Sequence, residues 1–163
     1  MSQPQHVIVT GAAGALGRAV VEYFLNQGAH VHALDISDEL LAASLADADS
    51  GRVQGYAVDL TSRSDCMRCV ASIRENAERI DVLCNVAGGF MMGEGVAETS
   101  DETWDFLFNL NTKSVMHMAA AVVPLMRESG AGKIINVGAL AAGQGLGQMG
   151  AYIASKSATI RLT

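Results

Sequence analysis

Two side chains near the end of the chain have the types and spacing of an acid–base pair. Tyr152 and Lys156 lie four residues apart in the segment AYIASK at 151–156. Four residues is just over one helical turn, so a helix that begins near Gly150 would place the phenol and the ammonium on one face. A neighbouring cation stabilises a phenolate. The pair therefore indicates proton transfer at the phenol oxygen.

A second chemical signal lies near the beginning of the chain, in the segment TGAAGALG at 10–17. Gly11, Gly14 and Gly17 follow a short apolar run and open a helical pattern, the setting in which such glycines cradle a dinucleotide. Gly11 permits a sharp turn, Gly14 lets the backbone approach a pyrophosphate, and Gly17 permits close helix–strand packing. The start of the helix would face the anion with free N–H groups. A tight turn without a ligand is the alternative.

Asp35 is the residue expected to select the dinucleotide. It ends the second apolar run, 18 residues after Gly17. A carboxylate there accepts hydrogen bonds from the adenosine ribose and repels a 2′-phosphate. No Arg or Lys stands at positions 12, 13, 36 or 37 to neutralise that phosphate. We therefore expect NAD rather than NADP as cofactor, with a solvated strand-end carboxylate as the alternative.

The elements that must position these residues alternate along the whole chain. Strands are predicted at His6–Thr10, His30–Ile36, Arg52–Leu60, Asp81–Ala87 and Lys133–Val137. Helices are predicted at Ala15–Gln27, after Ser37, after Thr61 or Ser62, from Asp101 to Arg127, and from Gly150. This alternation predicts right-handed crossovers and a three-layer, doubly wound parallel α/β sheet of Rossmann type, in a single domain over 1–163. Ligands of such sheets bind beyond the carboxyl ends of the strands.

Two helical patterns also assign faces. In the first helix Leu16, Ala19, Val20, Tyr23 and Phe24 fall on one apolar side. In the third helix Cys66 and Cys69 step at helical spacing with Val70, Ile73, Ala77 and Ile80. The cysteines are therefore expected on a buried face, and a redox or metal role for this C-x-x-C is the alternative.

Composition excludes several classes of protein. Half of the residues are hydrophobic and 17% are charged, which is typical of a globular chain. The net charge of −6 argues against nucleic acid and against an anionic membrane surface. The longest apolar run, 115–126, is too short to span a bilayer. A polar start without a secretory signal and an odd number of cysteines lead us to expect a cytoplasmic protein.

In these motifs the chain resembles the short-chain dehydrogenase/reductase family over essentially its whole length. The resemblance rests on TGAAGALG at 10–17, Asp35, DLT at 59–61, NVAG at 85–88, WDFLFNLN at 104–111, GKIINV at 132–137 and YIASK at 152–156. It implies an NAD-dependent oxidoreductase that transfers a hydride between nicotinamide and a small-molecule carbonyl/alcohol substrate. It also implies a homo-oligomer, either a dimer or a tetramer.

The resemblance implies a role for several residues. Tyr152 would be the general acid/base, Lys156 would bind the nicotinamide ribose and activate the phenol, and Asn111 would hold a water in a proton relay. The implied cofactor contacts are Gly11, Gly14, Leu16, Gly17, Asp35, Asp59, Leu60, Asn85, Ala87 and Gly88, with Tyr152 and Lys156. Without the resemblance, Asn111 is interpreted as an ordinary helix-surface amide.

The chain departs from the family pattern in three ways. Position 139, thirteen residues before Tyr152, is alanine where the family has a serine that hydrogen-bonds the reacting oxygen. Ser155 and Ser157 flank Lys156 and are expected to point elsewhere. Ala15 replaces a glycine, with little expected effect. The alanines at positions 139 and 15 both resemble dihydropteridine reductase-like members, which implies pterin-like substrates as an option.

The third departure is the end of the chain at Thr163, about two turns into the helix that carries Lys156. We therefore expect a truncated family member whose sheet is incomplete at the C-terminal edge, with an exposed fifth strand. A non-catalytic dinucleotide-binding module or sensor is the alternative function, favoured by Ala139 and disfavoured by the retention of Tyr152 and Lys156. The loop 88–100, with Phe90, Met91 and Met92, either lines an apolar pocket or covers the core.

Overall fold

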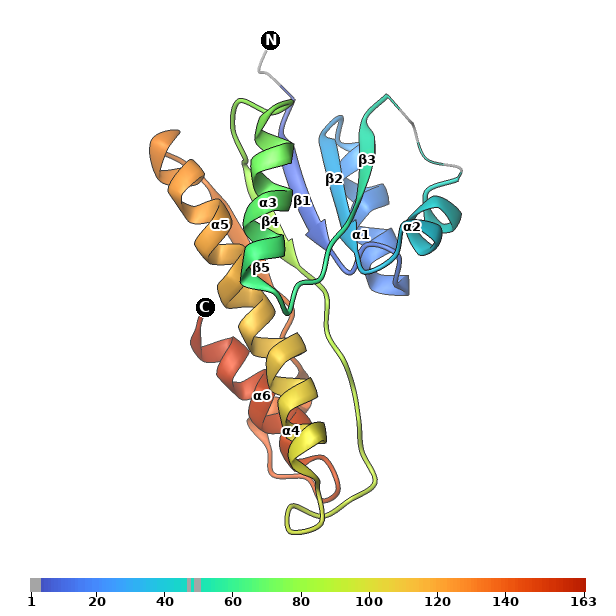
Figure 1. The fold of residues 1–163 in the computed structure, drawn as a ribbon, viewed down its shortest axis with the longest axis vertical. Coiled ribbons are helices and arrows are strands. Elements are labelled where there is room, and N and C mark those ends of the chain that lie inside the picture. The colour runs from blue at the N-terminus through green and yellow to red at the C-terminus, as the bar shows by residue number, and fades with distance from the viewer. Residues whose placement is uncertain (1–3, 47, 49–50) are drawn as a thin grey trace.

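The computed structural model describes residues 4–46, 48 and 51–163, and its centre is one parallel sheet (Figure 1). The strands are β1 (His6–Thr10), β2 (His30–Asp35), β3 (Val53–Ala57), β4 (Val82–Asn85) and β5 (Lys133–Asn136). Their order in the sheet is β3-β2-β1-β4-β5. The helices are α1 (Ala15–Asn26), α2 (Asp38–Ser44), α3 (Arg63–Arg74), α4 (Asp101–Phe108), α5 (Ser114–Glu128) and α6 (Gly150–Arg161). The predicted doubly wound α/β architecture is confirmed.

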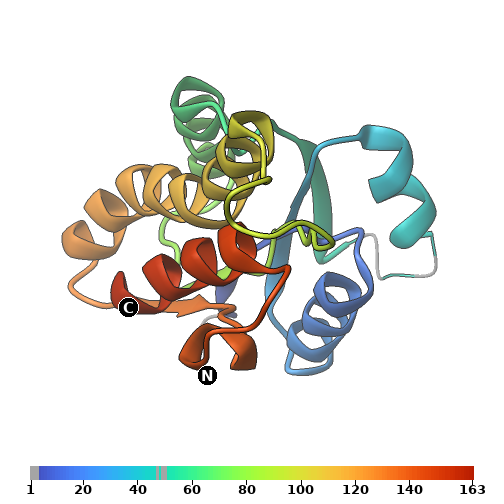
Figure 2. The same cartoon turned by 90° about the horizontal axis from the view of Figure 1, so that it is seen from below.

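Helices cover both faces of the sheet, because successive side chains of each buried strand point to opposite faces. Ile8 and Leu83 belong to a core cluster that also contains residues of α3 and α5. Val9 and Val31 belong to a second cluster on the other face, with residues of α1 and α2. Figure 2 shows α3 and α5 on one side of the strands and α1 and α2 on the other. The sheet is thus the middle of three layers.

The chemistry-bearing segments gather beyond the carboxyl ends of the strands. In Figure 1 the strand arrows point toward the loop that follows β4, and toward α4 and the beginning of α6. Helix α6 packs against α4 there. The strand order reverses direction at β1, so a crevice is expected between the segments that leave β1 and β4.

The predicted long helix Asp101–Arg127 is interrupted. A π-helical turn over Asn109–Lys113 separates α4 from α5. Turns of this kind widen a helix locally and occur often at functional sites. The predicted third and fourth strands are also too long: β3 ends at Ala57 and β4 at Asn85, because the residues that follow leave the ladder to form loops.

The predicted apolar side of α1 coincides with its buried face only in part, since Val20 and Phe24 pack against the core. Leu16 and Tyr23 are more than half exposed, whereas Gly17, Val21 and Leu25 are buried. The buried stripe follows the i, i+4, i+8 spacing from Gly17. Gly17 is the first residue of this stripe because it packs against the preceding turn. A search for apolar side chains leaves a glycine out, so the sequence pattern did not indicate where the stripe begins. Ser37 caps α2 by accepting a hydrogen bond from the N–H of Leu40, and Gly28, after α1, adopts a left-handed backbone.

The cysteines of α3 lie on its buried side, as predicted. Cys66 is fully buried and Cys69 is half-buried. Burial raises the pKa of the Cys66 thiol to about 11 and that of Cys69 to about 12, so both stay protonated at neutral pH. Among the described residues, no group of His, Cys, Asp and Glu is placed to hold a metal ion. The C-x-x-C therefore packs the core.

The C-terminal side of the sheet is open, as expected. Within the described residues β5 forms the outer edge of the sheet, and Ile135 of β5 is about half exposed, like Ile160 and Leu162 at the end of α6. No helix in the described part of the chain is long and apolar enough to cross a membrane. Residues 1–3, part of the polar start that argued against a secretory signal, lie outside the described residues.

A stack of imidazole rings occupies the amino ends of the strands. His6 stacks on His30 with ring centres 5.1 Å apart, and its Nδ1 is 3.2 Å from Nε2 of His32. The Tyr56 hydroxyl lies 3.4 Å from Nδ1 of His32. Burial, and then the neighbouring imidazoles, lower the pKa of His32 from 6.5 to about 4. The folded chain therefore holds His32 neutral where the unfolded chain would protonate it.

This stack makes stability depend on pH. Below pH 6.5 His32 is protonated in the unfolded chain, whereas in the folded chain it is protonated only below about pH 4. The free energy of unfolding therefore falls as the pH is lowered from 6.5 to 4. We expect His32 to lower the free energy of unfolding by about 2 kcal/mol when the pH falls from 7 to 5. Urea unfolding of wild type and His32→Phe at both pH values measures it: the variant should lose less stability on acidification, and equal losses would refute the assignment.

Candidate functional site

The glycine turn between β1 and α1 has the geometry of a cradle. Gly11 adopts a left-handed backbone with φ +64°, and a Cβ there would lie 2.8 Å from Cα of Ala87. A Cβ on Gly17 would overlap the carbonyl of Gly11. Helix α1 begins after Gly14 without a side-chain cap, so its first N–H groups face outward for an anion. The turn therefore needs glycine at 11 and 17 for its own packing.

Thr10 fixes this turn against the end of β4, a role that the sequence interpretation missed. Its buried hydroxyl oxygen accepts hydrogen bonds from the N–H groups of Val86 at 3.0 Å and Ala87 at 3.1 Å. The segment after β4 is thereby held against Gly11. A threonine that ends a buried strand directly before the glycine turn is the signal in the sequence.

A cavity of about 700 Å³ opens beside the glycine turn. Most of the residues expected to contact a cofactor line it: Gly11, Gly14, Leu16, Gly17, Asp35, Asp59, Leu60, Ala87 and Gly88. Phe106 and Leu110, from α4 and the π-helical turn, close the same cavity. The expected contact Asn85 has its side chain buried elsewhere, where its Nδ2 donates to Asn136 Oδ1 on β5 at 2.8 Å. Asn85 thus joins two strands beneath the site.

Asp35 lies at the end of β2 on the cavity wall. Its Oδ2 accepts a hydrogen bond from the N–H of Ala13 at 2.9 Å, and its Oδ1 accepts one from the N–H of Ile36 at 2.8 Å. The first bond ties the carboxylate to the glycine turn. The negative charge is therefore held in a fixed position beside the cavity.

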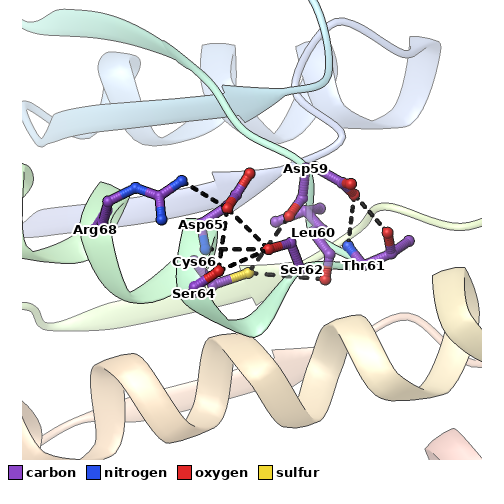
Figure 3. A network of polar contacts seen from close by, with 8 residues as sticks. All are labelled: Asp59, Leu60, Thr61, Ser62, Ser64, Asp65, Cys66 and Arg68. Atoms are coloured by element: carbon purple, nitrogen blue, oxygen red, sulfur yellow. Dashed lines mark hydrogen bonds and ion pairs between the residues drawn. The ribbon is translucent and has the colours of Figure 1, made fainter.

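A polar network beside Asp35 shapes the segment between β3 and α3 (Figure 3), where the N–H of Val58 donates to the carbonyl of Asp35 at 2.8 Å. Asp59 Oδ1 accepts from the N–H of Thr61 at 2.8 Å and from its hydroxyl at 2.6 Å. Ser62 caps α3 by accepting from the N–H of Asp65, and its hydroxyl donates to the Asp65 carboxylate at 2.8 Å. Arg68 pairs with the same carboxylate at 2.7 Å. The wall that carries Asp59 is thus fixed by its own side chains.

Tyr152 and Lys156, the pair predicted to act as acid and base, lie on α6, which begins at Gly150 as predicted. Lys156 is buried, and its Nζ donates to the carbonyl of Val137 at 2.8 Å. Burial lowers the pKa of this ammonium. Tyr152 is half-buried, and its ring meets that of Phe90 edge-to-face, with ring centres 4.8 Å apart. Carbonyl and aromatic contacts, rather than a carboxylate, hold the two side chains.

The pair and the cavity meet at the segment 88–90. A Cβ on Gly88 would lie 3.1 Å from Nζ of Lys156, Phe90 contacts the ring of Tyr152, and Gly88 itself lines the cavity. The helix with the acid–base pair and the cavity beside the glycine turn therefore share one short segment of backbone.

Asn111 is not a helix-surface amide, so that alternative is wrong. It is 1% exposed, at the centre of the π-helical turn. Its Oδ1 accepts from the N–H of Gly89 at 2.7 Å, and its Nδ2 donates to the carbonyl of Gly89 at 3.0 Å and to Ser155 Oγ at 2.9 Å. The amide thus clamps the segment 88–90 against α6.

The backbone carbonyl of Asn111 also has a partner that the sequence did not indicate. The buried hydroxyl of Thr159 donates to it at 2.8 Å, and the hydroxyl of Thr112 donates to the carbonyl of Ser155 at 2.9 Å. These bonds run in opposite directions between the π-helical turn and α6. The helix that carries Tyr152 and Lys156 is therefore locked to the π-helical turn by buried hydroxyl groups.

Neither Ser155 nor Ser157 replaces the serine hydroxyl that is missing at position 139. Ser155 donates to the carbonyl of Tyr152 at 2.8 Å, and Ser157 donates to the carbonyl of Ala142 at 2.9 Å. Both point to backbone, as expected. Ala139 itself precedes a 3-10 turn over Leu140–Gly143.

The sheet order, the glycine turn and the cavity at the strand reversal define a Rossmann-type α/β protein. A family model described as short chain dehydrogenase matches residues 5–163. The chain therefore belongs to the short-chain dehydrogenase/reductase family. The predicted family membership is confirmed.

Individual relatives and solved structures agree with this assignment. The chain is 34% identical to the NAD-dependent glycerol dehydrogenase of Listeria innocua, over 96% of this chain and 61% of the relative. It is 34% identical to the sorbitol dehydrogenase of Cereibacter sphaeroides, over 96% of this chain and 60% of the relative. The chain thus spans about three-fifths of these curated relatives.

Among solved structures, the NAD+-bound xylitol dehydrogenase has a TM-score of 0.93 at 28% identity, over 98% of this chain and 62% of that one. A metagenomic short-chain oxidoreductase in complex with NADP has a TM-score of 0.91 at 29% identity, over 97% of this chain and 72% of that one. The fold is therefore shared with structures that hold either dinucleotide.

Proposed function

We propose that this chain supplies the cofactor site and the acid–base pair of an NAD-dependent oxidoreductase, which interconverts a small-molecule carbonyl and its alcohol. The observation that supports this most is the meeting of the two sites at 88–90. Lys156 and Tyr152 contact this segment from α6, while Gly88 lines the cavity beside the glycine turn. Neither Tyr152 nor Lys156 lines the cavity itself, so the shared segment 88–90 is the observation that supports bringing the proton donor close to a bound dinucleotide.

The residues present fit such a cofactor. A cavity of about 700 Å³ is of the size that holds cofactors and drug-sized ligands. Gly11 and Gly17 leave no room for side chains, and the uncapped start of α1 suits a pyrophosphate. Asp35 and Asp59 would hold the adenosine end, and Lys156 the nicotinamide ribose. When bound, the nicotinamide donates or accepts the hydride.

In the direction of reduction, Tyr152 gives its hydroxyl proton to the substrate's carbonyl oxygen. The ammonium of Lys156 stabilises the phenolate that remains. The carbonyl of Val137 orients this ammonium. Asn111 ties the segment 88–90 to α6 through its hydrogen bonds to Gly89 and Ser155. In oxidation the phenolate takes the proton back from the alcohol.

We propose NAD rather than NADP as the cofactor. The fixed carboxylate of Asp35 lies on the cavity wall, where it repels a 2′-phosphate and accepts from ribose hydroxyls. The glycerol dehydrogenase relative is named as NAD-dependent and the xylitol dehydrogenase structure holds NAD+, which supports the same choice.

Asp35→Ala tests this choice. Removing the carboxylate deletes both the ribose contact and the repulsion, so the preference for NADH over NADPH should fall by about tenfold. Titration calorimetry with each dinucleotide measures the two dissociation constants. Glu39→Ala, which removes an exposed carboxylate from the first turn of α2, is the matched control and should leave the ratio unchanged. An unchanged ratio in Asp35→Ala would refute the ribose contact.

A non-catalytic dinucleotide-binding module remains the second candidate, favoured by Ala139, which offers no hydroxyl to a reacting oxygen. Turnover that depends on Tyr152 decides between the two. We further propose a cytoplasmic homo-oligomer, with the exposed side chain of Met116 on α5 at the subunit contact. Burial of such apolar surface favours association.

A further inference from the structure

Phe90 is the aromatic side chain that the structure places against the proton donor. The ring centres of Phe90 and Tyr152 are 4.8 Å apart and the rings are inclined by 87°, an attractive edge-to-face arrangement. A substrate oxygen must lie within hydrogen-bond reach of the Tyr152 hydroxyl. The groups attached to the reacting carbon therefore come close to the ring of Phe90.

Phe90 is held there by the residue that precedes it. The N–H and the carbonyl of Gly89 are both bonded to the amide of Asn111, at 2.7 Å and 3.0 Å. The same amide donates to Ser155 Oγ at 2.9 Å, and the Ser155 hydroxyl donates to the carbonyl of Tyr152 at 2.8 Å. One buried amide thus ties Phe90 and Tyr152 together. With 55% of its surface exposed, Phe90 keeps a free side for a ligand.

The loop that contains Phe90 and the loop that precedes α6 also carry exposed apolar side chains. Met92, in the loop with Phe90, and Leu140 and Leu146, in the loop before α6, are exposed. The stretch 138–151 contains no charged residue. The two loops are joined by a hydrogen bond from the N–H of Gly93 to the carbonyl of Gln148 at 3.0 Å. Although Glu94, Gln144 and Gln148 are polar side chains of these loops, the surrounding is mostly apolar and suits a substrate that carries an apolar group.

We propose that Phe90 determines substrate specificity, an inference that rests on the proposed function. It selects carbonyl compounds that carry a flat, apolar ring next to the reacting carbon, over open-chain polyhydroxy ketones. In the reaction the carbonyl carbon accepts a hydride with its electron pair, and the π pair moves to the oxygen, which takes the Tyr152 proton. The ketone is reduced to the alcohol while the nicotinamide cofactor is oxidised.

Two probes and three variants test this proposal. Isatin, a flat bicyclic ketone, and dihydroxyacetone, an open-chain one, are each reduced with NADH, and the ratio of their kcat/KM values is measured. Wild type should favour isatin, and Phe90→Leu should lower the ratio by about tenfold because it loses the flat face. Phe90→Tyr, which keeps that face, should restore the ratio. Tyr23→Leu, which removes an exposed aromatic ring from α1, is the control and should not change it.

A wild type that prefers dihydroxyacetone, or a ratio unmoved in Phe90→Leu, would overturn the proposal. Isatin binding, measured by calorimetry on the same variants, separates this outcome from failure of the proposed function. If neither ketone is reduced, the proposed function fails, and the binding data still decide the role of Phe90. Weaker isatin binding in Phe90→Leu than in wild type and Phe90→Tyr supports the role, whereas equal affinities contradict it.

Discussion

Replacing Tyr152 with phenylalanine is expected to lower kcat by at least about a thousandfold. The change removes one oxygen atom and keeps the ring, so the contact with Phe90 and the packing of α6 are retained. The affinity for NADH should therefore fall by no more than about tenfold, the effect of losing one hydrogen bond to the nicotinamide ribose. A loss of turnover far larger than the loss of cofactor affinity is the signature of a group that acts on the substrate.

Steady-state kinetics and NADH binding measure the two effects separately. The single tryptophan, Trp104, lies on α4, whose Phe106 lines the cavity, so energy transfer from Trp104 to NADH reports binding. Tyr23→Phe, which removes an exposed phenol oxygen from α1, is the matched control and should change neither quantity. Full turnover in Tyr152→Phe would favour the non-catalytic module. Equal losses of turnover and binding would instead indicate that Tyr152 maintains structure.

The second large effect is expected at Gly17. A Cβ at this position would overlap the carbonyl of Gly11, so Gly17→Ala must push α1 away from the turn. We expect NADH affinity to fall by about a hundredfold or more, since the turn and the start of α1 both move. The unfolding free energy should fall by about 1–3 kcal/mol, as in other overpacked sites.

Gly55→Ala is the control for this substitution. A Cβ on Gly55, in β3, would lie 3.5 Å from Cβ of Leu41, an ordinary contact, so stability and NADH affinity should remain near wild type. Both variants are compared by urea unfolding and NADH titration. Wild-type affinity in Gly17→Ala would show that the glycine turn is not the cofactor cradle.

Much of the fold was predictable because its signals are local. Alternating apolar runs and helical spacing give the order of strands and helices, and Gly11, Gly14 and Gly17 mark a turn that needs residues of that type. Asp35 was found because a strand end is a position that the sequence pattern defines. The cysteine helix was interpreted correctly for the same reason, since its buried stripe follows one helical period.

The rest of the site depends on contacts between distant residues. Asn111 bonds to Gly89 and Ser155, and Thr159 bonds to Asn111, across 22 to 48 residues of chain. No periodicity encodes such pairs, and the π-helical turn that buries Asn111 has no pattern of its own. Thr10 was missed because its hydroxyl partners lie 76 and 77 residues away. The phase of α1 was missed because its buried stripe of Gly17, Val21 and Leu25 begins with a glycine, which a pattern of apolar side chains leaves out.

A crystal structure of this chain with NAD would show where the dinucleotide binds and which way its nicotinamide end points. We expect the pyrophosphate at the start of α1 beside Gly14, the adenosine ribose on Asp35, and the nicotinamide ribose within hydrogen-bond distance of Lys156 and Tyr152. A dinucleotide bound elsewhere, or one whose nicotinamide end points away from Tyr152, would contradict this expectation.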